Sequence, residues 1–244
     1  MQAVIQSGGK GTRLRPYTLV LPKPLMPVRS QPVLELLLKW LRRNGTDDVY
    51  ITTGYLGHLI RTVCGDGHQW GLRIHYTQEV EPMGTVGALS MLRDELTGTF
   101  IALNGDILTD LNLSAFVAAH RRSGGMLTIA TASRPLHMDF GVIEERHGRV
   151  VQFREKPTLS NIVSMGIYCM EPELLDHIPN GVPFGFDDLM VCLMAKDIPV
   201  HTFLHHGCWL DIGRAEDFQK AQELPWDEGV PSYESSPMVL ESAK

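Results

Sequence analysis

Three glycines and an arginine stand close together near the N-terminus, in the run Ser7-Gly8-Gly9-Lys10-Gly11-Thr12-Arg13. The segment Ala3–Gln6 before this run predicts a strand that leads directly into it. Glycines let backbone N–H groups approach an anion closely, so a loop of this composition is typical of phosphate binding. The candidate nucleotide-binding residues of the loop are Ser7, Gly8, Gly9, Gly11 and Thr12.

The loop does not match the two most familiar nucleotide-binding patterns. No GxxxxGK[ST] can be drawn through it, and the dinucleotide pattern requires a glycine where Leu14 stands. Further along, Lys23 lies between Pro22 and Pro24, and both prolines stiffen the backbone around it. We therefore expect Arg13 and Lys23 to hold one triphosphate together and to act as catalytic residues.

From Gly8 to Val28 the sequence resembles the opening motif of the sugar-1-phosphate nucleotidyltransferases, or NDP-sugar pyrophosphorylases, which reads GGxGTRLxPxTxxxPKPxxPV. A motif of this length is far less prone to chance matches than a short one. The resemblance extends over residues 1–222 and is nearest to short mannose-1-phosphate guanylyltransferases. It implies an enzyme that couples a nucleoside triphosphate, GTP by preference, to mannose 1-phosphate or a related sugar phosphate and releases pyrophosphate.

A second stretch resembles the family's EPLGTAGAL element, here Glu81-Pro82-Met83-Gly84-Thr85-Val86-Gly87-Ala88-Leu89. The resemblance implies that the tight turn at Gly84 and Thr85 lets backbone groups reach the base. Gln78, just upstream, resembles a base-contacting position. Without the resemblance, a glycine-rich turn before a helix is more often structural than functional.

Two aspartates are candidate metal ligands. Asp106 follows an apolar strand, so it should lie at the carboxyl end of the sheet, where ligands bind in open α/β folds, although Asn-Gly-Asp is also a common turn composition. Asp211 lies in Trp209-Leu210-Asp211-Ile212-Gly213, which resembles the family's WxDIG. The resemblance implies that the two carboxylates bind one Mg²⁺, a cation that favours oxygen ligands completed by phosphate and water. It also makes Asp106 a catalytic candidate.

Two further elements resemble the parts of the family that hold the sugar and its phosphate. Phe140-Gly141-Val142 resembles FGV, and Glu155-Lys156-Pro157 resembles EKP. The resemblance implies that Lys156 meets the phosphate and Glu155 a sugar hydroxyl. The last three residues of the family's NAGIY element are matched by Gly166-Ile167-Tyr168, and Ser164 stands in place of its asparagine. Gly141 and Ser164 complete the candidate sugar-phosphate residues.

The chemistry that this set implies needs no general base. A sugar phosphate has a second pKa near 6, so it presents an anionic oxygen at neutral pH, and that oxygen attacks the α-phosphorus in line. The protein then positions two anions and neutralises the charge on the leaving pyrophosphate. No recognisable His or Ser nucleophile occurs in the sequence, which agrees with this scheme.

Three other interpretations compete with this one. A homologue that binds a nucleotide sugar and regulates a true enzyme would share the motifs, and a glycosyltransferase would share the sheet. Donors other than GTP, namely UTP, dTTP, CTP or ATP, remain open within the family. The histidines near Cys208 suggest a transition-metal site, but no matching Cys/His pair occurs elsewhere, so structural or surface histidines are the favoured interpretation.

The elements that must position these residues alternate between strand and helix. This alternation predicts a single-domain α/β fold, Rossmann-like and of the GT-A type, with a mixed, mainly parallel sheet flanked by helices. Pro32–Asn44 is the clearest helix, with Glu35 and Lys39 paired on its polar face. Further helices are expected at Asp187–Lys196 and Arg214–Leu224. The predicted strands are Ala3–Gln6, Val49–Thr53, Leu72–Tyr76, Phe100–Leu103, Leu127–Thr131, Gly141–Glu144, Arg149–Phe153, Ile162–Met170 and Pro199–Leu204.

Residues 1–224 are predicted to form the nucleotidyltransferase domain, and residues 225–244 a tail. The tail turns to Pro, Ser, Glu and Gly after Pro225, a composition that cannot bury enough apolar surface to order itself. We expect it to be flexible or to pack on a partner subunit.

Composition restricts the partners and the compartment. The net charge of −6 argues against binding nucleic acid or an anionic membrane, both of which favour a basic excess. Four scattered cysteines and the absence of a long apolar stretch favour the cytoplasm. The expected partners are a nucleoside triphosphate and a sugar 1-phosphate, and the protein could form a homo-oligomer.

Overall fold

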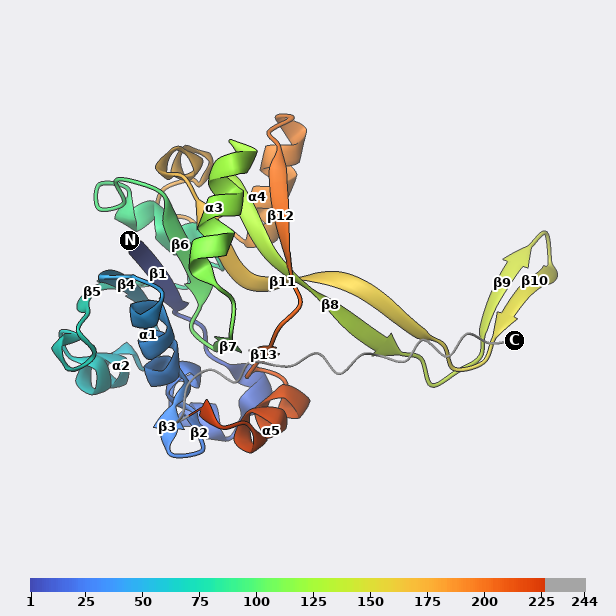
Figure 1. Ribbon diagram of the computed structural model, residues 1–244, viewed down its shortest axis with the longest axis horizontal. Helices are drawn as coiled ribbons and strands as arrows, with labels where there is room; N and C mark the ends of the chain where they lie inside the picture. Colours follow the sequence, from blue (N-terminus) through green and yellow to red (C-terminus); the bar gives the residue numbers. More distant parts are fainter. Residues whose placement is uncertain (227–244) are drawn as a thin grey trace.

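The computed structural model describes residues 1–226 and has a seven-stranded sheet at its centre, in the order β12-β8-β11-β6-β1-β4-β5 (Figure 1). Strands β1, β4, β5 and β6 run parallel, whereas β11 runs antiparallel to both of its neighbours. This confirms the predicted α/β fold with a mixed, mainly parallel sheet. The strands are β1 (Gln2–Ser7), β4 (Asp48–Thr53), β5 (Arg73–Gln78), β6 (Phe100–Asn104), β8 (Leu127–His137), β11 (Thr158–Met170) and β12 (Val200–His205).

Helices cover both faces of this sheet. Successive residues of a strand point to opposite faces, so Ala3 and Ile5 pack into one core and Val4 into the other. Helices α1 (Val33–Arg43), α2 (Gly57–Cys64) and α3 (Leu113–Ser123) contribute to the first core, and α4 (Phe186–Ala195) to the second. Because both faces are covered, the central strands are continuous apolar runs, which made them recognisable in the sequence.

The first helix forms close to the residues for which the sequence predicts it. The predicted pair forms, with Lys39 Nζ 2.7 Å from Glu35 Oε1. The helix ends at Arg43, Asn44 is its C-cap, and Gly45 takes up a left-handed backbone with φ of 77°.

A small third layer closes the lower part of the molecule in Figure 1. It contains two short antiparallel pairs, β2 (Pro27–Val28) with β3 (Gln31–Pro32) and β7 (Ile107–Thr109) with β13 (Trp209–Asp211), together with α5 (Ala215–Glu223). These short pairs were not predicted, since two or three residues are too few to show a period.

The predicted tail needs a correction at its first apolar residue. Trp226 is buried in an apolar cluster with Val33, Leu36 and Ala221, and its indole N–H donates to the Ala221 carbonyl at 2.8 Å. An aromatic ring of this size stabilises the end of the chain against α1 and α5. Residues 227–244 of the predicted tail lie outside the described residues.

Strands β8 and β11 continue past the sheet as a two-stranded ribbon. At its far end lies a hairpin of β9 (Val142–Arg146) and β10 (Arg149–Arg154), so the ribbon and hairpin project from the body of the molecule (Figure 1). We call residues 133–163 the arm. The predicted strands in this region are confirmed in type, but β8 and β11 are longer than predicted, because their outer halves lack the apolar runs of the buried halves.

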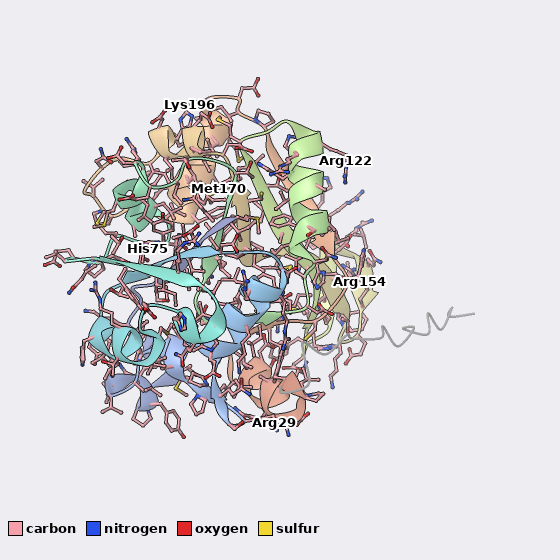
Figure 2. The ribbon with its side chains drawn as sticks, turned by 60° about the vertical axis from the view of Figure 1, so that its left-hand side comes forward. Arg29, His75, Arg122, Arg154, Met170 and Lys196 are labelled. Carbon is pink, nitrogen blue, oxygen red and sulfur yellow. The ribbon has the colours of Figure 1, made fainter. Side chains whose placement is uncertain are left out.

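In the body of the molecule, buried apolar side chains are well separated from exposed charged ones. Met170 lies in the core, whereas Arg122 and Lys196 point outward from the helical layers (Figure 2). All four cysteines are free thiols. Within residues 1–226, no helix has the length and apolar character needed to cross a membrane.

Candidate active site

A cavity of about 440 Å³ opens at the carboxyl ends of the central parallel strands. Its walls come from the ends of β1, β4 and β6 and from the segments that follow β1 and β5. Ligands of open α/β sheets bind at this edge. The cavity gathers ten of the residues predicted from the sequence: Ser7, Gly8, Gly9, Gly11, Thr12, Arg13, Lys23, Gly84, Thr85 and Asp106.

The glycine loop keeps its shape through two local contacts. Gly11 has φ of 60°, a left-handed conformation that side chains rarely adopt, and its carbonyl accepts a hydrogen bond from Thr18 Oγ1 at 2.9 Å. A Cβ at Gly8 would overlap the carboxylate of Glu79. A side chain at position 8 would therefore have to displace the Glu79 carboxylate.

Asp106 and Asp211 converge beside Lys23. The β7–β13 pairing places Asp211 opposite Ile107, and the amide of Ile212 donates to the Asp106 carbonyl at 2.9 Å. The Lys23 ammonium pairs with the Asp106 carboxylate and lies 3.5 Å from Asp211 Oδ1. Asp211 is only 25% exposed, although it does not line the cavity itself.

The position of Lys23 changes the expected electrostatics of the two aspartates. Two facing carboxylates would repel each other, but here an ammonium group lies between them and offsets that repulsion. Burial lowers the pKa of Lys23, the Asp211 carboxylate acts in the opposite direction, and the Arg13 guanidinium adds to the lowering. Lys23 thus gives up its proton more readily than an exposed lysine.

The surroundings of Lys23, Asp106 and Asp211 indicate whether a divalent cation would fit at this position. Two carboxylates already surround one cation, and hard oxygen ligands are those that Mg²⁺ takes. Among residues 1–226, no group of three or more His, Cys, Asp or Glu side chains is placed to hold a metal ion. A metal bound by Asp106 and Asp211 would therefore need its other ligands from substrate and water.

One residue that sequence reasoning missed lies deep in the cavity. Glu79 is 9% exposed, lines the cavity and accepts a hydrogen bond from the Met83 amide at 3.0 Å. Burial raises its pKa, and that hydrogen bond acts in the opposite direction. The predicted base-contacting residue, Gln78, ends β5, is exposed and lies outside this cavity.

Polar atoms in the cavity wall lack partners within the protein. The side-chain amide of Gln6 and the hydroxyl of Ser7 are buried and make no hydrogen bond. Buried polar groups are nearly always hydrogen-bonded, so orphaned ones call for an explanation. A polar ligand in this cavity would satisfy them.

The structure does not bring the predicted sugar-phosphate residues to this cavity. Gly141, Glu155 and Lys156 lie on the arm, at the base of its hairpin, and all three are exposed. Ser164 lies in β11 beside an irregularity in the β8–β11 ladder, and its hydroxyl accepts the Gly166 amide at 3.2 Å. Lys156 has φ of 39°, a strained backbone for a residue with a side chain.

A sheet covered on both faces, with a glycine-loop cavity at its carboxyl edge, is the arrangement found in nucleotide-binding α/β proteins. The sequence profile of the family described as "Nucleotidyl transferase" matches residues 2–226. The chain belongs to this family.

Curated relatives carry several specificities. A UTP–glucose-1-phosphate uridylyltransferase of Synechocystis sp. is 34% identical over 91% of this chain, and a probable mannose-1-phosphate guanylyltransferase 2 of Arabidopsis thaliana is 34% identical over 89%. The chain spans 62% and 63% of the lengths of these two relatives.

Solved structures share the fold. A putative glucose-1-phosphate thymidylyltransferase from Bacillus anthracis superposes with a TM-score of 0.74 at 23% identity, covering 93% of this chain and 96% of that one. HddC from Yersinia pseudotuberculosis, complexed with GMP-PN, gives a TM-score of 0.72 at 23% identity, covering 91% of this chain and 98% of that one. At this level of identity the likeness concerns the fold.

Proposed function

We propose that this protein transfers a nucleotidyl group from GTP to mannose 1-phosphate or a related sugar 1-phosphate, with release of pyrophosphate. The observation that carries the proposal is the single cavity that gathers the glycine loop, Arg13, Lys23 and Asp106 around orphaned polar atoms. Membership of the nucleotidyl transferase family supports the reaction class. The named relatives act on sugar 1-phosphates, which supports the acceptor class.

In the proposed reaction an anionic oxygen of the sugar phosphate attacks the α-phosphorus of the triphosphate. A new phosphorus–oxygen bond forms, the bond to the β-phosphate breaks, and pyrophosphate leaves with the electron pair. The attacking oxygen is already ionised at neutral pH, so no side chain has to remove a proton. Arg13, Lys23 and the loop amides would hold the triphosphate and stabilise charge as it moves to the leaving group.

Mg²⁺ is the proposed cofactor, with Asp106 and Asp211 as its protein ligands. When bound, the cation would neutralise phosphate charge at the site of transfer. The Lys23 ammonium would then be released from the two carboxylates and become available to the phosphates, because a cation of higher charge has taken its role.

The choice of guanine rests on Glu79. The edge of guanine that pairs with cytosine carries two adjacent N–H donors, and a carboxylate, which only accepts, suits that edge. Uracil and thymine present one donor between two carbonyl oxygens, which a carboxylate repels. A buried carboxylate in the wall of the cavity thus favours GTP over UTP and dTTP.

For the sugar phosphate, Gly141, Glu155, Lys156 and Ser164 remain our proposed contacts. Lys156 supplies a cation for the phosphate and Glu155 an acceptor for a hydroxyl. Gly141, Glu155 and Lys156 are exposed on the arm, so the arm and a cavity must meet when the acceptor binds.

A second candidate keeps the chemistry but changes the base, because one of the relatives named above is a uridylyltransferase. A third is a nucleotide-sugar-binding regulator without catalysis, for which the retained Arg13, Lys23 and Asp106 give no specific support. The deciding experiment measures pyrophosphate release for each nucleoside triphosphate paired with each sugar 1-phosphate, with and without Mg²⁺. GTP with mannose 1-phosphate or a related sugar should give the highest rate. A preference for another triphosphate would reject guanine as the base. If no pair of substrates released pyrophosphate, the proposed enzymatic activity would be rejected.

A further inference from the structure

Strand β1 carries two glutamines on the same face of the sheet, and their side chains differ in what they bind. At the start of the strand, the Gln2 side chain donates to the Glu95 carbonyl at 2.7 Å and accepts the Thr97 amide at 3.2 Å. Near its end, the oxygen and the nitrogen of the Gln6 carboxamide are both buried and make no hydrogen bond within residues 1–226. Because Gln6 lines the main cavity, its missing partner should come from a ligand there.

Gln6 belongs to a row of polar residues that crosses three neighbouring strands. The register places it opposite Asn104 of β6 on one side and Thr52 of β4 on the other. All three residues line the cavity, and each stands two positions beyond a residue that packs in or against the second core. On this face of the sheet, the strands therefore change from apolar to polar side chains where they reach the cavity.

The Glu79 carboxylate continues this row. It accepts hydrogen bonds from the Thr52 hydroxyl and from the Met83 amide. Gln6 and Glu79 thus flank Thr52 in one wall of the cavity, and Glu79 offers an acceptor where Gln6 offers an N–H₂ donor. In the proposed function, Glu79 accepts the two N–H donors of guanine. The same edge of that base carries one more group beside those donors, a carbonyl oxygen that needs a donor of its own.

We propose that the Gln6 carboxamide donates to this carbonyl oxygen and is a specificity-determining residue of the site. The assignment rests on the proposed function, because it requires a guanine whose N–H donors face Glu79. The glutamine side chain turns about three single bonds, so its amide can reach a base held in the cavity that it lines. A carboxylate and a carboxamide then read a base edge that carries adjacent donors and one acceptor.

Gln6→Leu separates a ligand contact from a structural role, because leucine nearly keeps the volume and removes the amide. The variant should bind GTP about tenfold more weakly, since the oxygen of the base loses its donor. Without nucleotide it should melt at an equal or higher temperature, because an apolar group has replaced an unpaired buried amide. Isothermal titration calorimetry and thermal melting measure the two effects. A lower melting temperature with unchanged GTP affinity would overturn the proposal and make Gln6 structural.

Gln2→Leu is the matched control, because it changes the same residue type on the same face of the same strand. Its hydrogen bonds with Glu95 and Thr97 are lost, so the variant should melt at a lower temperature and bind GTP as the wild type does. If Gln2→Leu lost as much GTP affinity as Gln6→Leu, any change in β1 would disturb the cavity, and the assignment of Gln6 would be overturned.

The triphosphate of 6-thioguanosine tests which atom Gln6 contacts. This probe keeps both N–H donors of guanine but carries sulfur, a weak acceptor, in place of the carbonyl oxygen. The wild type should bind it about tenfold more weakly than GTP, whereas Gln6→Leu should bind the two equally. ITP keeps the oxygen and lacks the amino group, so Gln6→Leu should weaken its binding as it weakens that of GTP. An equal loss for GTP and the thio analogue would place the contact elsewhere and overturn the assignment.

These titrations measure binding alone, so they separate this assignment from the proposed function. A wild-type protein that binds UTP or dTTP and not GTP would reject guanine and the assignment together. GTP binding that Gln6→Leu leaves unchanged would reject the assignment alone, even if the protein is an active guanylyltransferase. Binding of GTP and ITP that depends on Gln6 would support the assignment even if no sugar phosphate reacts.

Discussion

Asp217 accepts the backbone N–H of Asp211 at 3.0 Å through one oxygen and pairs with Arg134 through the other. The proposed metal ligand is thereby tied to a buried carboxylate in α5 and to the base of the arm. Asp217 was not recognised in the sequence, because it lies in the polar-looking helix that follows the WLDIG segment.

Asp217→Asn tests whether this link positions the metal ligand. The change weakens the pair with Arg134 and the hold on the Asp211 amide, so the Mg²⁺ concentration for half-maximal rate should rise about tenfold, as for other partners of metal ligands. A Mg²⁺ titration of the initial rate measures this. Asp47→Asn, an exposed carboxylate paired with Arg42, is the control and should leave the Mg²⁺ curve unchanged. Loss of stability with an unaltered Mg²⁺ curve would make Asp217 purely structural.

Arg13→Ala and Lys23→Ala should lower kcat more than they raise KM. Their charges matter most as negative charge moves onto pyrophosphate, and loss of such a contact costs about 3–4 kcal/mol of transition-state stabilisation. Steady-state kinetics with both substrates varied gives the two constants. Lys39→Ala, a lysine on the exposed face of α1, should behave as wild type. A raised KM with unchanged kcat would show that the residue contributes only uniform binding.

Asp106→Asn should lower the melting temperature in metal-free buffer and reduce kcat by about 10²-fold or more. Relief of repulsion between the two aspartates would have raised the melting temperature, but Lys23 already lies between them and loses its partner in this variant. Mg²⁺ should stabilise the wild type and not the variant, because binding to the folded state alone raises stability. Thermal melting across a Mg²⁺ series checks both points. Normal turnover in Asp106→Asn would remove this residue from the site.

Glu79→Gln should shift the preference between GTP and UTP by about 10- to 100-fold toward UTP, since an amide can donate to a carbonyl oxygen that a carboxylate repels. The ratio of kcat/KM values for the two triphosphates measures the shift. Glu81→Gln, two residues further on and exposed, is the control. An unchanged ratio would show that Glu79 does not contact the base.

The raised pKa of Glu79 also predicts a pH dependence. Guanine donors favour the ionised carboxylate, so GTP binding should weaken as pH falls through the pKa of Glu79, which lies above the ordinary value of 4.5. The folded state holds this proton more tightly than the unfolded chain, so Glu79 costs stability as pH rises from 4.5 through its folded pKa, and the cost is constant above it. Binding and melting measured against pH should show both trends in the wild type and neither in Glu79→Gln.

The sequence predicted the sheet well, because long apolar strands act locally, and most of the predicted nucleotide-binding residues line one cavity in the structure. Gln78, the predicted base-contacting residue, lies outside the main cavity, whereas the next residue, Glu79, lines it, since successive residues at a strand end face opposite ways. The arm could not be foreseen. Its strands have local signals, but the direction in which they leave the body depends on Arg134 and Asp217, which lie 83 residues apart.

The pairing of β7 with β13 can form only late in the synthesis of this protein. Asp106 and Asp211 meet only through that pairing, whereas β1, β4, β5 and β6 join within the first 104 residues. Contacts distant in sequence form late, and chains fold from the N-terminus as they are synthesised. A growing chain on the ribosome can therefore assemble its phosphate loop long before it can assemble its pair of aspartates. Translation that stops short of β13 yields a chain that keeps the glycine loop but lacks the second carboxylate.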